Sequence, residues 1–230
     1  MAKEEMSRGV ERAIYTIRDN TAPTRYNHAV TQGKGGNSMC RICESKQETV
    51  DHILSGCGKL GFTEYLSRHN SVAKTIVASV LRSRGHKFPR SWWRHKIPSH
   101  IFLSDTSHIQ WEPKVPTVEK LEHNKPDLLL CLEDGTRVII EVTVCKDEYV
   151  VERSELKEQK YLELRADLAR RYQSKVINIA IAIGITGVVS IKTREAVQKL
   201  NRYGIPLVLS KLQKAAATGS AIILRRVLGQ

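Results

Sequence analysis

The chain has 230 residues, 41% of them hydrophobic, so it can bury one substantial core and still carry a small additional module. Its formal net charge of +13 favours a polyanionic partner such as the phosphate backbone of a nucleic acid. An anionic membrane would also attract this charge, but the sequence has no apolar run near the length of a spanning helix and no clear basic amphipathic surface helix. We therefore expect no membrane partner.

The N-terminal part is predicted to contain two helices separated by a polar boundary. Residues 4–18 predict a short helix that stops at the turn-like sequence DNTAP, and no uninterrupted apolar stretch indicates a signal peptide. The glycine-rich loop TQGKGGNS then leads into a cluster of cysteines. A longer helix is predicted after the cysteines, because the residues of its apolar stripe recur at spacings of three and four. It should end near Gly85, since glycine is a helix stop signal. The stripe comprises Phe62, Leu66, His69, Val72, Ala73, Ile76 and Val80.

The second half of the chain alternates strands and helices. Residues 86–118 hold all three tryptophans and four of the seven prolines, so we expect an irregular, partly exposed segment in which HIQWEP can form a short strand. A strand, an Asp-Gly hairpin and a second strand should follow from residue 125. The remaining predicted elements are helix 151–173, the buried strand KVINIAIAIG, helix 193–203, the strand IPLVLS and helix 211–227. This order predicts a mixed α/β sheet with flanking helices.

Four soft metal ligands lie close together in the sequence. They are spaced as Cys40-x2-Cys43-x8-His52-x4-Cys57, and this spacing can close a tetrahedral, structural Zn²⁺ site. The alternatives are a chance CxxC and a redox dithiol, although the redox motif belongs in a βαβ context that is missing here. The five cysteines are an odd number, and without secretory features they favour a reducing intracellular compartment.

Two carboxylates stand in or beside the predicted hairpin. Asp127 opens the first apolar run and Glu141 lies in the middle of the second, where an unpaired charge would be costly. An antiparallel pairing around the Asp-Gly turn can bring them together at one end. Such a pair needs a cation, and Mg²⁺ is the usual cation for hard oxygen ligands beside phosphate. A plain hairpin with two edge carboxylates is the alternative.

The helix after the hairpin supplies two lysines. Lys157 and Lys160 precede Tyr161 on the side expected to face the sheet. A lysine here can orient the attacking water or stabilise charge on a scissile phosphate. Metal, carboxylates and lysine together predict hydrolysis of a phosphodiester. Ordinary solvated lysines are the alternative.

Other candidate contacts are less specific. His69 lies on the apolar stripe of its helix, which favours a half-buried, hydrogen-bonded histidine over a ligand. The tryptophan pair 92–93 beside Arg90 and Arg94 can stack on unpaired bases next to phosphates. It can equally fix the long segment to the core, and we favour that interpretation.

In order along residues 15–200, several motifs resemble one family. They are RDNTAPTR, CRICESKQETVDHILSGC, SRHNSVAKTIVASVL, KPDLLL, VIIEVTV and KEQKY. The set is similar to the C-terminal region of the Pol polyprotein of site-specific non-LTR retrotransposons, which insert into ribosomal RNA genes. The resemblance implies a CCHC zinc knuckle followed by a restriction-enzyme-like endonuclease of the PD-(D/E)xK type. That enzyme nicks target DNA, and the freed 3′ end primes reverse transcription.

The resemblance also implies an organisation and a setting. An N-terminal helical linker would occupy 1–37, the zinc knuckle 38–60, and the endonuclease 61–230 with its Trp/Pro-rich insert at 86–118. A reverse transcriptase domain normally precedes this region, so the chain is expected to be a fragment, a truncated copy or a predicted open reading frame. DNA is the implied partner, element RNA a further one, and the nucleus, including the nucleolus, the implied location.

The same resemblance assigns roles to individual residues. The four soft ligands would form the knuckle, and Asp127 and Glu141 would bind the catalytic metal. Thr143 stands where the compact motif has its lysine, so the lysine moves to the helix, where Lys160 with Tyr161 is the best match and Lys157 the competitor. The motif that includes Arg68 and His69 would contact nucleic acid.

Two other functions stay open. The first is a non-catalytic nucleic-acid-binding remnant that keeps the zinc and the charge, and the second is an RNA-binding accessory fragment that depends on the tryptophan segment. Asp127 with Glu141 discriminates between cutting and binding, because a module that only binds a polyanion has no need of two acids.

Overall fold

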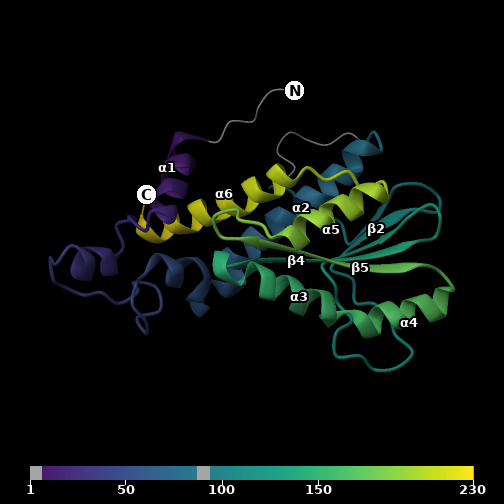
Figure 1. The fold of residues 1–230 in the computed structure, drawn as a ribbon, viewed down its shortest axis with the longest axis horizontal. Coiled ribbons are helices and arrows are strands. Elements are labelled where there is room, and N and C mark those ends of the chain that lie inside the picture. Colours follow the sequence, from purple (N-terminus) through teal and green to yellow (C-terminus); the bar gives the residue numbers. More distant parts are fainter. Residues whose placement is uncertain (1–6, 87–93, 230) are drawn as a thin grey trace.

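A five-stranded mixed sheet forms the centre of the computed structural model, which describes residues 7–86 and 94–229. Its strands, in spatial order, are β1 (His100–Phe102), β2 (His108–Trp111), β3 (Leu128–Cys131), β4 (Arg137–Cys145) and β5 (Val176–Gly184). All neighbours pair antiparallel except β4 and β5, which are parallel. The predicted mixed α/β sheet with flanking helices is confirmed (Figure 1).

Local sequence explains the central strands. The predicted hairpin joins β3 to β4, and Gly135 in its turn has φ +77°, a conformation that glycine adopts without strain. β5 is buried at all nine positions, because helices cover both faces of a strand that pairs in parallel with β4. The connection from β4 to β5 runs through two helices, as a parallel crossover requires.

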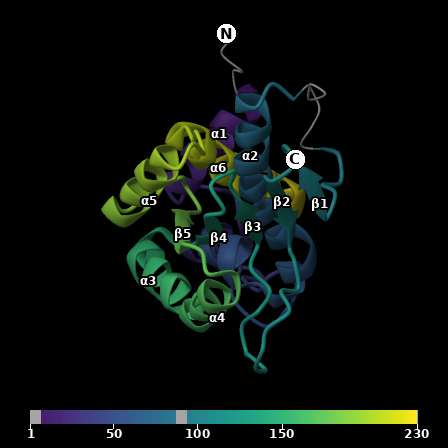
Figure 2. The same ribbon diagram turned by 90° about the vertical axis from the view of Figure 1, so that its right-hand side faces the viewer.

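Helices cover both faces of the sheet. α2 (Leu66–Ser83), α5 (Ile191–Arg202) and α6 (Leu209–Leu228) pack on one face, whereas α3 (Val150–Lys160) and α4 (Leu162–Tyr172) pack on the other (Figure 2). α1 (Arg8–Arg18) lies on α6. Short helical turns occupy Asn27–Thr31, His52–Gly56, Gly58–Leu60, Gly61–Tyr65 and Asp147–Tyr149. None of the helices in the described ranges is long and apolar enough to cross a membrane.

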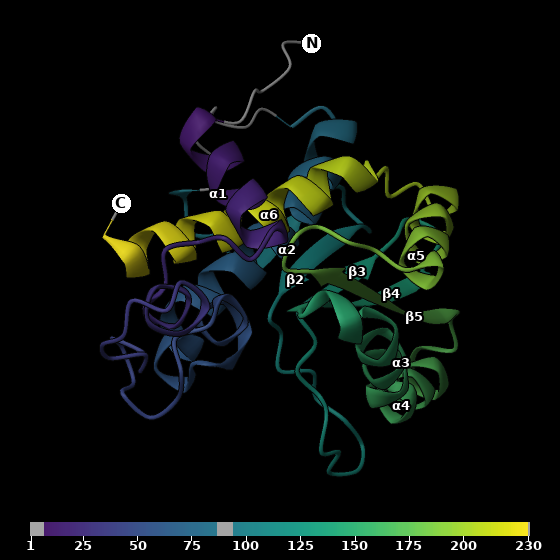
Figure 3. The same ribbon diagram turned by 60° about the vertical axis from the view of Figure 1, so that its left-hand side comes forward.

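The cysteine segment packs beside the C-terminal half of α6. Its buried Ile53, Leu54 and Leu60 share a hydrophobic cluster with Ile223 and Leu224 of that helix. Figure 3 shows these N-terminal turns next to the C-terminal end of the chain. A segment with little core of its own thus gains one from a helix that follows far later in the sequence.

Two predicted elements are wrong. The single helix 151–173 is broken at Tyr161, whose backbone leaves the helical region while its ring enters the core and its hydroxyl donates to Lys125 O. The predicted strand 205–210 is a loop running into α6. There the side chain of Asn201 bonds both backbone groups of Leu207, which a neighbouring strand would otherwise satisfy.

Candidate metal cluster and catalytic pocket

The four predicted soft ligands come together. The ligand atoms of Cys40, Cys43, His52 and Cys57 all lie within 4.8 Å of one another, and Cys43 Sγ is 3.2 Å from His52 Nε2. Tetrahedral zinc, with Zn–S bonds near 2.3 Å, holds its ligand atoms roughly 3.5–3.8 Å apart. The cluster can therefore bind a metal ion such as zinc after small adjustments.

A tight turn positions the first two cysteines. Cys40 N donates to Lys46 O, and Glu44 N donates to Cys40 O with Glu44 in the left-handed region at φ +56°. Hydrogen bonds from Ser45 lower the pKa of Cys43 to about 5, which favours the thiolate that binds metals. Burial instead raises the pKa of Cys57 to about 11. A bound cation would favour deprotonation of that thiol too.

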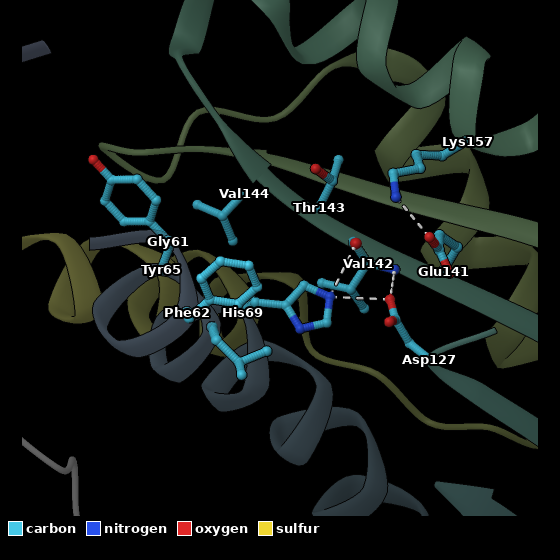
Figure 4. Close-up of a pocket in the computed structure, with 11 residues that line it drawn as sticks. Gly61, Phe62, Tyr65, His69, Asp127, Glu141, Val142, Thr143, Val144 and Lys157 are labelled. Carbon is cyan, nitrogen blue, oxygen red and sulfur yellow. Dashed lines mark hydrogen bonds and ion pairs between the residues drawn. The ribbon is translucent and has the colours of Figure 1, made fainter. Parts of the chain in front are cut away.

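Asp127 lies one residue before the start of β3. The register that pairs Leu128 with Ile140 puts Asp127 and Glu141 next to each other across the two strands. β4 continues beyond this point, and Val142 N donates to Asp127 Oδ2 at 2.7 Å (Figure 4). The carboxylate therefore continues the hydrogen-bond ladder where the β3 backbone no longer reaches.

Glu141 is only 3% exposed, and the two predicted lysines contact it. Lys157 Nζ and Lys160 Nζ donate to the same oxygen, Oε1, at 2.6 and 2.9 Å. The other oxygen, Oε2, is buried and has no hydrogen-bond partner among the described residues. Both ion pairs of the carboxylate therefore fall on the same oxygen.

His69 brings α2 to the same site. Its Nε2 lies 3.0 Å from Asp127 Oδ2 and 3.2 Å from Val142 O, and its Nδ1 lies 3.1 Å from Asn70 Oδ1. Burial alone would lower the pKa of His69, but the hydrogen bond and charge of Asp127 outweigh it and raise that pKa to about 9. The pKa of Asp127, which burial alone would raise, is lowered chiefly by His69. The two side chains form an ion pair at neutral pH.

The expected half-buried, hydrogen-bonded histidine is thus confirmed, but the sequence did not reveal its partner. The apolar stripe indicated that His69 faces the sheet. The signal that could have revealed its partner was the charged Asp127 at the end of a predicted strand. Spacing along the chain cannot show that residues 58 positions apart meet.

These groups open into a pocket of about 390 Å³ between α2 and β4. Asp127, Glu141, Lys157 and His69 line it, and Figure 4 shows their side chains directed toward a common region. The remaining lining residues are Gly61, Phe62, Tyr65, Leu66, Val142, Thr143 and Val144. Both acids and one of the two lysines therefore line the same pocket.

Other predicted residues take different positions. Tyr161 is buried and donates to Lys125 O, and burial followed by the charge of Glu141 raises its pKa, so its position supports a packing role. Arg68 is 3% exposed and donates to Ser220 Oγ, which does not support its predicted contact with nucleic acid. Arg94 is exposed. Arg90 and the tryptophan pair 92–93 lie outside the described residues.

Comparison with known proteins adds no assignment. No protein-family model matches the chain, and no curated protein matches it.

Proposed function

We propose that the chain is a metal-dependent DNA endonuclease of the PD-(D/E)xK type, with a structural zinc ion in the cysteine cluster. One observation carries the proposal: a buried glutamate keeps one oxygen without a partner in the described part of the chain, beside a second carboxylate and two lysines. The order of strand, hairpin, strand and lysine-bearing helix supports the restriction-like assignment.

The acids fit Mg²⁺ chemically. Glu141 Oε2 has no partner among the described residues, and no residue in the described ranges donates a hydrogen bond to Asp127 Oδ1. An unpaired buried oxygen of this kind costs about 1–3 kcal/mol or more, and a hard divalent cation would remove that cost. A bound Mg²⁺ would polarise the phosphate and lower the pKa of a water ligand.

The protein's own groups would orient and stabilise the reacting phosphate. His69 and Val142 N hold Asp127 in one rotamer, which is a positioning role. Lys157 lines the pocket, so its ammonium can move from Glu141 to an oxygen of the scissile phosphate. Lys160 can remain on Glu141 and hold it in place. We therefore favour Lys157 as the catalytic lysine and Lys160 as its support.

The family resemblance extends the proposal to a biological setting. Nicking would occur at a target site in nuclear DNA, and the freed 3′ end would prime synthesis by a reverse transcriptase domain normally joined upstream. The formal net charge of +13 supports DNA as the partner and also suits element RNA.

One observation favours the non-catalytic alternative. Two lysines pair with Glu141 Oε1, and His69 pairs with Asp127, so three cationic side chains face two carboxylates. A site of this kind can bind phosphate without cutting it.

Plasmid nicking in Mg²⁺ tests the proposal. Wild type should convert supercoiled DNA to nicked circles, whereas Asp127→Ala and Glu141→Gln should bind DNA and leave it intact. Asp105→Ala, which removes an exposed acid from a loop between β1 and β2, is the matched control and should cut normally. Zinc content must be equal in all variants. If every variant binds and none cuts, the endonuclease proposal fails and the binding remnant is the better account.

A further inference from the structure

The most exposed large apolar side chain described stands at the mouth of the catalytic pocket. Phe62 was predicted to lie on the apolar stripe of the helix that ends near Gly85, but it sits in the turn Gly61–Tyr65 before α2 and is 92% exposed. Leu66, one turn later, is 46% exposed, and both side chains line the pocket. The ring of Phe62 projects beside His69 and Val144 (Figure 4).

Leu66 separates two hollows of different character. On one side is the pocket with the carboxylates, and on the other a hollow of about 310 Å³ that Leu66 also lines. The other residues of this second hollow are Thr63, Ser67, Asn70, Ser71 and Lys74, all polar. Phe62 and Leu66 therefore form an exposed apolar ridge, with the charged groups of the pocket on one side and a polar hollow on the other.

The ridge stands on a rigid base. Tyr65 OH accepts a hydrogen bond from Cys57 N at 3.0 Å and donates to Ile53 O at 2.8 Å. Glu64 of the same turn accepts from Arg226 Nη1 of α6 at 2.7 Å. A side chain that is exposed but held by a fixed backbone loses little conformational freedom when a partner covers it.

The charge beside the ridge identifies the kind of partner. Lys157 and Lys160 lie on the pocket side, next to the acids, where a phosphate would be held. An aromatic face next to a phosphate site suits a nucleobase, because every base presents a π-face that stacks on an aromatic ring. Apolar side chains inserted beside bases also unstack them.

We propose that Phe62 and Leu66 form a stacking wedge that receives an unpaired base next to the scissile phosphate. The proposal rests on the proposed function, since it places DNA in the catalytic pocket. It assigns the ridge a positioning role, in which stacking of the base fixes the neighbouring phosphate over the carboxylates.

The test uses a short DNA duplex with one unpaired 2-aminopurine, in Mg²⁺-free buffer with zinc retained. Binding of wild type should change the probe's fluorescence, and Phe62→Ala should lose that change and bind roughly 5- to 150-fold more weakly. Phe62→Trp should restore both. Phe102→Ala is the matched control, because Phe102 is 68% exposed on β1, away from the pocket.

Three outcomes would overturn the wedge. The first is that Phe62→Ala binds and fluoresces like Phe102→Ala, and the second is that Phe62→Ala weakens binding to a fully paired duplex by the same factor. The third is that Phe62→Ala abolishes self-association of the protein, which would assign the ridge to contact with a second copy. The assay requires no cleavage, so stacking without nicking would refute the endonuclease alone. Nicking with unchanged KM and kcat in Phe62→Ala, together with unchanged fluorescence, would refute the wedge alone.

Discussion

Replacing Glu48 with alanine should destabilise the cysteine segment, although this residue binds no metal. Glu48 is fully buried and accepts four hydrogen bonds. The donors are the backbone N of Arg25 and of Arg41, each at 2.8 Å, and two nitrogens of the Arg41 guanidinium, at 2.8 and 2.7 Å. One side chain thus ties the turn before Cys43 to the chain near Arg25.

The loss of stability in Glu48→Ala depends on the hydrogen-bond donors that lose their acceptor. Removing one partner of a fully buried ion pair costs about 3–5 kcal/mol. The Arg41 side chain is 29% exposed, so water can solvate part of the guanidinium after the change. We therefore expect a loss of about 2–3 kcal/mol in the free energy of unfolding, mostly from the two backbone N–H groups and the charge left without an acceptor.

Urea denaturation of the zinc-loaded protein, followed by circular dichroism, measures this loss. Transfer of zinc to a chromogenic chelator should also be faster in Glu48→Ala. Glu195→Ala, an exposed position on α5, is the control and should stay within about 0.5 kcal/mol of wild type. A loss in Glu48→Ala no larger than in this control would refute the reasoning.

The same residue predicts a pH dependence. Burial alone would raise the pKa of Glu48, but the hydrogen bonds and charge of Arg41 outweigh it and lower the pKa below the usual value. A depressed folded-state pKa adds stability above the unfolded pKa of about 4.3, and this stability is lost as pH falls through the folded pKa. The gap in unfolding free energy between wild type and Glu48→Gln should therefore shrink below about pH 4.

Other measurements test the remaining assignments. Lys157→Ala should lower single-turnover nicking roughly 10²- to 10³-fold, more than Lys160→Ala does, and equal losses would contradict the assignment of the pocket-lining lysine. His69→Ala should weaken Mg²⁺ binding, measured calorimetrically, by about 10- to 100-fold, because Asp127 loses its orienting donor. Chelation of zinc should accelerate hydrogen exchange in residues 38–60 while β4 and β5 stay protected; uniform exchange would mean that the cluster supports the whole fold.

Much of the framework could be predicted where local signals agree. The Asp-Gly turn marked the β3–β4 hairpin, the apolar run marked β5, and Gly85 marked the end of α2, where it has φ +76°. The cysteine spacing also predicted a cluster that the fold brings together. In each case neighbours in sequence are sufficient to determine the local geometry.

Predictions from the sequence failed where contacts between residues distant in the chain determine the structure. Tyr161 breaks its helix because a hydroxyl partner lies at Lys125. Phe62 matched the apolar spacing of α2, but the turn before the helix directs it outward, and periodicity cannot distinguish the two. The pairing of His69 with Asp127 depends on how α2 crosses the sheet, which no local pattern encodes.

The hydroxyl of Tyr65 ties the cysteine segment to the pocket, and this determines where the chain can be divided. It accepts from Cys57 N and donates to Ile53 O, while the same residue lines the pocket. A cut between residues 60 and 61 would leave this hydroxyl without its partners and uncover Ile223 and Leu224 on α6. The metal cluster and the pocket should therefore be inherited as one unit, and a shortened chain that begins at residue 61 should aggregate.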